Sequence, residues 1–134
     1  MSFTKSRRTD VGVDAVMDRE QARHFAEEWI AAWNSHDLER ILAHYEDDFE
    51  MSSPIITQVM GEPSGTLRGK TAIGAYWSLA LERNPQLHFE LLHTLPGANS
   101  LAIIYNGLRG LSAEIFHFGT SGKVVAAYAH YQPC

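Results

Sequence analysis

Residues 18–54, DREQARHFAEEWIAAWNSHDLERILAHYEDDFEMSSP, decide the fold of this chain. Asp18 is followed three residues later by Gln21, which is the spacing of a capping box at the start of a helix. Apolar side chains then recur at three- and four-residue intervals, the period of one helix face: Ala22, Phe25, Ala26, Trp29, Ile30, Ala32 and Trp33. We therefore expect a long amphipathic helix here, with a row of aromatic side chains on one side.

A short second helix and a strand are expected to follow. Residues 34–37, Asn-Ser-His-Asp, break the first helix and supply cap chemistry. Leu38, Ile41, Leu42 and Tyr45 then repeat at helical spacing, which predicts the second helix. Residues 49–53 are typical of a strand, and Pro54 is expected to stop it.

The aromatic row on the first helix has two interpretations. A large apolar surface must cover it, and the later strands can supply that surface. Trp29 and Trp33 are then either ordinary core residues or the wall of a cavity between the helix and a curved sheet.

The rest of the chain predicts one more helix and an antiparallel sheet. Residues 55–69 are expected to form an extended piece and a loop over one end of the domain. Residues 70–83 have helical periodicity, which Asn84-Pro85 ends. From residue 86 the period changes to two, and turn residues divide the chain into strands near 87–95, 101–105, 112–118 and 123–131. The fold class is therefore α+β, with three helices on a mainly antiparallel sheet.

Composition restricts the class of protein. The chain has 134 residues and a net charge of −5, which suits one domain at residues 15–134 after a flexible tail at residues 1–14. The acidic balance argues against a nucleic-acid partner. The single cysteine, Cys134, permits no internal disulfide, and no apolar run is long enough for a membrane span. We expect a cytoplasmic protein with no membrane partner.

Three segments carry a family resemblance: AAWNSHDLERILAHYEDDFEMSSP (31–54), GEPSGTLRGKTAIGAYW (61–77) and GKVVAAYAHY (122–131). With them, the chain resembles the nuclear transport factor 2 superfamily, and within it the SnoaL-like branch, over roughly residues 18–132. The resemblance implies a cystatin-like α+β cone whose helices and curved sheet enclose a pocket. Its members include ketosteroid isomerases, polyketide cyclases, dehydratases, epoxide hydrolases and binding modules without catalysis, so fold alone selects no function.

The resemblance can be carried over residue by residue. Ketosteroid isomerases have an oxyanion-donating Tyr where this chain has Trp29, and a general-base Asp where it has Ser53. A serine hydroxyl is too weakly basic to remove a carbon-bound proton unaided, so steroid isomerisation is not expected. The second pocket acid of that family matches Glu114. SnoaL-like cyclases rely on an acid of this kind on a late strand, and the resemblance therefore implies an acid/base role for Glu114.

Strand periodicity allows two environments for Glu114. With Thr120-Ser121 at the centre of a turn, Glu114 would lie opposite Ala127, and the small Ala127 and Ala129 would leave room above it. In an apolar pocket its carboxyl group would have a raised pKa and could transfer protons. Alternatively, Glu114 pairs with Arg109 or Arg68 at a strand edge and has a structural role.

His93 and Tyr105 are the other candidate catalytic residues, because both fall on the apolar parity of their strands. Either could polarise an oxygen of a substrate, or could be a hydrogen-bonded core residue. The seven histidines show no HxH or HExxH spacing, so we expect no metal, and no motif indicates a cofactor.

The leading hypothesis is a cofactor-independent isomerase, cyclase or lyase that moves a proton on a small hydrophobic carbonyl compound. The residues expected to bind the substrate are Trp29, Trp33, Ser53, Trp77 and Tyr131. The alternatives are a binding module without catalysis and a dimeric interaction protein. The other parity of the last strands leaves an apolar outer face with Ile115 and Tyr128, on which we expect a homodimer to form, as relatives commonly do.

Overall fold

The computed structural model describes residues 17–133, and the tail expected at residues 1–14 lies outside this range. Four helices and six strands follow one another along the chain. They are α1 (Arg19–Ser35), α2 (Leu38–Leu42), β1 (Tyr45–Ser52), α3 (Pro54–Met60), β2 (Thr66–Arg68), α4 (Lys70–Arg83), β3 (Glu90–Gly97), β4 (Ser100–Gly107), β5 (Gly110–Phe118) and β6 (Val124–Tyr131). The α+β fold class predicted from the sequence is confirmed.

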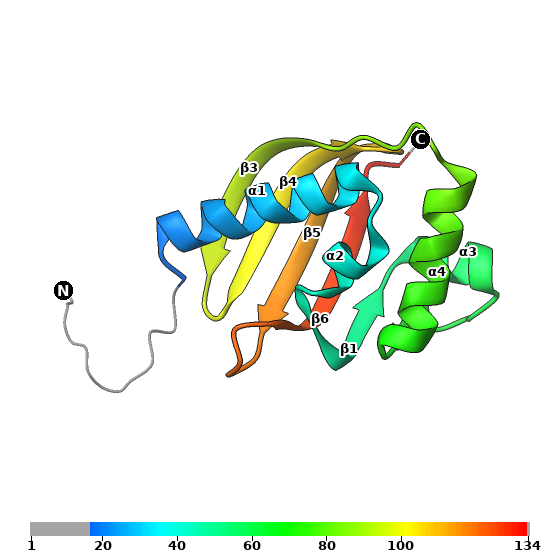
Figure 1. Cartoon of the computed structure of the whole chain (residues 1–134), viewed down its shortest axis with the longest axis horizontal. Helices are drawn as coiled ribbons and strands as arrows, with labels where there is room; N and C mark the ends of the chain where they lie inside the picture. Colours follow the sequence, from blue (N-terminus) through cyan, green and yellow to red (C-terminus); the bar gives the residue numbers. More distant parts are fainter. Residues whose placement is uncertain (1–16, 134) are drawn as a thin grey trace.

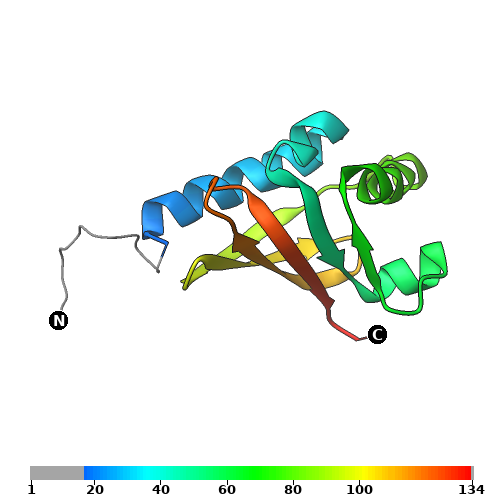
Figure 2. The same ribbon diagram turned by 90° about the horizontal axis from the view of Figure 1, so that it is seen from below.

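All six strands form one curved sheet in the order β2-β1-β6-β5-β4-β3. Neighbouring strands are antiparallel except β1 and β6, which run parallel. Helix α1 crosses one face of this sheet diagonally, and α2 and α4 lie beside it (Figure 1). The view from below shows α1, α2 and α4 on that face, which we call the inner face, and α3 at one end of the sheet (Figure 2). No helix covers the strands β3–β6 on the other face, which we call the outer face.

Helix α1 begins and packs as its sequence predicts. The Asp18 side chain accepts a hydrogen bond from the Gln21 backbone N–H at 2.9 Å, and the Gln21 side chain accepts one from the Asp18 backbone N–H. The helix ends where His36 takes a left-handed backbone conformation. Its buried stripe faces the sheet and contains Ala22, Ala26, Trp29, Ala32 and Trp33.

The segment after β1 differs from its prediction. Residues 54–60 form helix α3 rather than an extended piece, so there are four helices among the described residues rather than three. The Ser53 hydroxyl caps α3 by accepting from the Ile55 N–H at 3.1 Å, Pro54 occupies the first helical position, and Gly61 ends the helix with a φ of +70°. Pro54 was interpreted as the end of a strand, but it also starts a helix. In addition, Tyr45 begins β1 rather than ending α2.

The register between β5 and β6 also differs from its prediction. Glu114 pairs with Ala129, not with Ala127. The turn is centred one residue further along β6 than expected, and a one-residue bulge between His117 and Phe118 adds a second residue, so the parity is kept. The β4–β5 turn is Leu108-Arg109, between the paired residues Gly107 and Gly110.

Among the described residues, no helix is long and apolar enough to cross a membrane.

Candidate active site

A cavity of about 350 Å³ lies between the helices and the inner face of the sheet. Much of its wall is apolar and comes from α1, β1, α3, α4 and the segment leading into β3: Trp29, Trp33, Met51, Ile55, Trp77, Leu87 and Phe89. Its polar side chains come chiefly from α4 and from strands β4–β6: Tyr76, Arg83, Asn84, Tyr105, Arg109, Ser112, Glu114 and Tyr131. An apolar cavity of this size with a few polar groups is typical of a small-molecule site.

The pairing of β4, β5 and β6 gathers the polar groups. Tyr105 pairs with Ser112, and Ser112 pairs with Tyr131, so these three side chains form one row across the inner face. Glu114 lies in the next row on the same face, where its partner on β6 is Ala129. Glu114 therefore has a short side chain as its neighbour on β6, and it lines the cavity.

Glu114 is a buried acid with a raised pKa. Only 3% of its surface is exposed, and burial raises the pKa of its carboxyl group to about 8, while a hydrogen bond from Tyr105 acts in the opposite direction. The Tyr105 hydroxyl donates to Oε1 of Glu114 at 3.3 Å. Arg68 pairs with Glu50 at 3.0 Å instead, and no cation among residues 17–133 forms an ion pair with Glu114. The described residues therefore do not support the alternative in which Glu114 pairs with Arg109 or Arg68.

The charge of Glu114 affects the pKa values of three tyrosines that line the cavity. Burial raises the pKa of Tyr76, Tyr105 and Tyr131, and the charge of Glu114 raises each of them further. The Ser53 hydroxyl and the charge of Arg109 act in the opposite direction on Tyr76 and Tyr131. All three phenols therefore stay protonated at neutral pH and can only donate or accept hydrogen bonds there.

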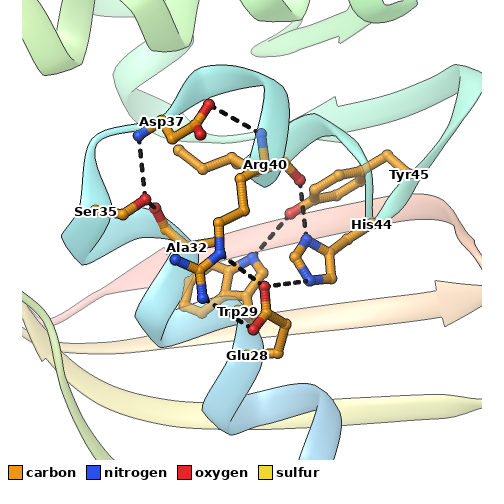
Figure 3. A network of polar contacts seen from close by, with 9 residues as sticks. Glu28, Trp29, Ala32, Ser35, Asp37, Arg40, His44 and Tyr45 are labelled. Carbon is orange, nitrogen blue, oxygen red and sulfur yellow. Dashed lines mark hydrogen bonds and ion pairs between the residues drawn. The ribbon is translucent and has the colours of Figure 1, made fainter.

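A polar network fixes α1 against α2 and β1 (Figure 3). The Nε1–H of Trp29 donates to the Tyr45 hydroxyl at 2.9 Å in the protein interior. On the surface side of the same network, Arg40 binds both carboxylate oxygens of Glu28 at 3.0 Å. Because the Trp29 N–H is committed to Tyr45, this residue contributes an apolar wall to the cavity and no free donor.

Trp33 differs from Trp29 in this respect. It lines the cavity, and only 6% of its surface is exposed. Its Nε1 atom is buried and has no hydrogen-bond partner in the part of the chain that the structure describes. A buried donor without a partner has a substantial free-energy cost, and an acceptor on a bound molecule is one way to remove it.

Six of the residues predicted for the site line this cavity, namely Glu114, Tyr105, Trp29, Trp33, Trp77 and Tyr131. The expectation that His93 points inward is wrong. A bulge after Leu91 shifts the register, so Leu91 pairs with inward-facing Tyr105 whereas His93 pairs with Ile104 on the outer face. His93 is exposed and lies outside the cavity.

Ser53 does not line the cavity either. It is buried, its hydroxyl caps α3, and it borders a second depression that shares Tyr131 with the cavity. Ser53 was expected to contact the substrate because it matches the position of the general-base Asp in ketosteroid isomerases. That position is occupied by a helix cap instead.

Sequence reasoning missed several polar lining residues. Tyr76 lies on α4 and Ser112 on β5, and the periodicity of these elements does not mark either residue as a polar group of a site. Arg83 and Arg109 lie at the end of α4 and in the β4–β5 turn, two positions whose proximity depends on the tertiary fold. No group of three or more His, Cys, Asp or Glu side chains within residues 17–133 is arranged to hold a metal ion.

The fold is a cystatin-like α+β fold with an apolar cavity between its helices and its sheet. The SnoaL-like domain family matches residues 26–131. A SnoaL-like protein of unknown function from Burkholderia thailandensis E264 is 56% identical, with a TM-score of 0.84 over 87% of this chain and 98% of that one. The chain therefore belongs to the SnoaL-like family.

More distant structures share the fold. A protein of unknown function with a cystatin-like fold from Methylobium petroleophilum PM1 is 18% identical, with a TM-score of 0.70 over 89% of this chain and 80% of that one. The epoxide hydrolase/cyclase-like enzyme SalBIII, from pyran ring formation in the polyether salinomycin, is 15% identical, with a TM-score of 0.67 over 86% and 93%. No curated protein matches the chain significantly.

Proposed function

We propose that this protein is a cofactor-independent isomerase, cyclase or lyase that transfers a proton on a small hydrophobic molecule bearing a carbonyl group. One observation carries this proposal: Glu114 is buried, lines an apolar cavity, and has the Tyr105 hydroxyl at 3.3 Å but no cationic partner among residues 17–133. A carboxyl group in such surroundings is costly to maintain for structure alone.

The pKa of Glu114 suits proton transfer at neutral pH. At about 8 it leaves roughly a tenth of the protein with an ionised Glu114 at pH 7. The ionised form is a base strong enough to take a proton from a carbon next to a carbonyl, and the abundant neutral form can return that proton or donate it to an oxygen. A group whose pKa is near the working pH can therefore do both in turn.

Tyr105 is the residue best placed to hold the reacting oxygen. Its hydroxyl is in contact with Glu114, and its pKa is well above the usual value because it is buried and close to Glu114. Once Glu114 has taken up a proton, its O–H can donate to the Tyr105 oxygen, and the phenol hydrogen is then free to donate to a carbonyl oxygen as negative charge develops there. His93, the other residue predicted for this role, is excluded by its position on the outer face.

A binding module without catalysis is the second candidate. The cavity is already well formed and apolar, and Trp33 offers an unpaired donor, both of which would serve binding alone. Binding alone does not require the raised pKa of Glu114. If Glu114→Gln binds its ligand as well as wild type and loses no function, the binding module is favoured.

Deuterium exchange tests the proposal. The protein is incubated in D₂O with 2-tetralone, cyclohexanone and 4-phenylbutan-2-one, and incorporation next to the carbonyl is followed by NMR. We expect acceleration of exchange for at least one ketone, and a loss of about 10²–10⁴-fold in Glu114→Gln.

Glu39→Gln, at an exposed carboxylate on α2, is the matched control and should exchange at the wild-type rate. Equal rates in wild type and Glu114→Gln would contradict the proposal. Binding of a ketone without any exchange would support the binding module instead.

A further inference from the structure

We propose that the rim of the cavity binds an anionic group, and that the ligand is a small apolar molecule carrying a carboxylate. This inference rests on the function proposed above and narrows its substrate class. The rim consists of the lining residues that are also exposed to solvent, namely Val59, Arg83, Leu108 and Arg109. Two of these four side chains are therefore guanidinium groups.

The charges in the cavity are unbalanced. Arg83 and Arg109 are the basic residues in its lining, and Glu114 is the acidic one. Since Glu114 is mostly neutral at pH 7, the cavity carries a net positive charge close to two. No carboxylate among residues 17–133 pairs with Arg83 or Arg109, whereas Arg23, Arg40 and Arg68 each have a glutamate partner.

The fold places both arginines at one end of the sheet. Helix α4 ends at Arg83 on the side where β4 turns into β5, as the ribbon shows (Figure 1). The charge of Arg109 lowers the pKa of Tyr76 and Tyr131, so this guanidinium acts on hydroxyls inside the cavity and not only on solvent. A guanidinium presents paired N–H donors that fit the two oxygens of a carboxylate.

The aromatic wall of the cavity indicates which kind of molecule could carry the carboxylate. Behind the rim, the wall is formed by aromatic rings, and Trp33 and Trp77 lie edge to face with ring centroids 5.2 Å apart. These rings favour a flat apolar body over a sugar or a nucleotide. A flat apolar body inside and a carboxylate at the rim together describe an amphipathic carboxylic acid.

Binding of matched naphthalene probes tests this inference. Isothermal titration calorimetry at pH 7 would compare 2-naphthoate with 2-naphthamide, which has the same shape and no charge. We expect 2-naphthoate to bind about tenfold more tightly, and more weakly as salt increases. Arg83→Gln and Arg109→Gln should each weaken 2-naphthoate several-fold and change 2-naphthamide less than twofold.

Arg23→Gln is the control, because Arg23 lies on α1 outside this cavity and pairs with Glu20 at the surface. Equal affinity for the two probes, no binding of either, or unchanged affinity in both arginine variants would overturn the inference. The carboxylate preference should survive in Glu114→Gln, which lacks the proton-transfer group. A preference without ketone exchange would therefore overturn only the catalytic proposal, and exchange without a preference would overturn only this inference.

Discussion

The hydroxyl of Tyr105 on β4 donates a hydrogen bond to Oε1 of Glu114 on β5, and both side chains are at least 97% buried. The two residues are diagonal neighbours on the inner face, since Tyr105 pairs with Ser112 and Glu114 with Ile103. This hydrogen bond favours the ionised carboxyl group, whereas burial favours the neutral one, and burial has the larger effect. The protonation of Glu114 is therefore linked to the stability of the whole fold.

Glu114→Gln should change how stability depends on pH. The pKa of Glu114 is raised to about 8 in the folded protein from 4.5 for the unperturbed group, so the folded state holds a proton that the unfolded state releases. The contribution of Glu114 to the free energy of unfolding should be greatest below pH 4.5. It should fall by about 1.4 kcal/mol per pH unit between the two pKa values. Gln removes this slope, so the variant should melt at a similar temperature at pH 5 and at a higher one at pH 9.

Thermal melts of both proteins from pH 5 to pH 9 measure this difference, with Glu39→Gln as the control for removing an exposed carboxylate. If Glu114→Gln melts lower than wild type at neutral and high pH, Glu114 is a paired structural carboxylate and the proton-transfer hypothesis loses its central residue.

Tyr105→Phe should raise the pKa of Glu114 above about 8, because it removes the hydrogen bond that stabilises the carboxylate. The effect on stability should be on the order of 1 kcal/mol. NMR titration of protein labelled with ¹³C at the glutamate carboxyl groups would follow Glu114 directly. Tyr128→Phe, at a partly exposed tyrosine on the outer face, should leave the titration unchanged. An unchanged or lower pKa in Tyr105→Phe would contradict the assigned contact.

Tyr45→Phe should destabilise the fold, although it removes only one oxygen atom. The Trp29 Nε1–H donates to the Tyr45 hydroxyl at 2.9 Å, and both side chains are almost fully buried. Without the hydroxyl, the indole N–H is left without its acceptor, which costs about 1–3 kcal/mol. Urea denaturation would measure the loss, and Tyr128→Phe should stay within about 0.5 kcal/mol of wild type. Equal stability of Tyr45→Phe and wild type would show that another group or water replaces the hydroxyl.

The parts of this structure that follow from local periodicity were predictable from the sequence. The stripe of α1 placed Trp29 and Trp33 toward the sheet, and the alternation in β5 placed Glu114 on the inner face. Periodicity gives the face of a side chain even where the register is two residues off, as it was for Glu114 and Ala129. The family resemblance then indicated which inward-facing acid could be functional.

Features that depend on a single irregularity or on tertiary proximity were not predictable. The bulge after Leu91 exchanges the faces of the strand, so the alternation that seemed to place His93 inward places it outward. Residues 54–60 are too short for helical periodicity to be visible, and their helix depends on the cap at Ser53. Arg83 and Arg109 both line the cavity because α4 and the β4–β5 turn lie at the same end of the sheet, and no local sequence pattern encodes this arrangement.

The outer face of the sheet predicts a homodimer. Leu95, Ala102, Ile115 and Tyr128 pair in one row across β3, β4, β5 and β6, with Leu95 55% and Tyr128 36% exposed. A contiguous apolar row on a sheet without covering helices favours association with a second copy of the same face.

Light scattering after size exclusion should give twice the 15.0 kDa chain mass for wild type. Tyr128→Glu should give the monomer mass, because it introduces a charge into the apolar row. Met60→Glu, at an exposed methionine on α3, should remain a dimer. A monomeric wild type, or a dimer that Tyr128→Glu leaves intact, would contradict this prediction.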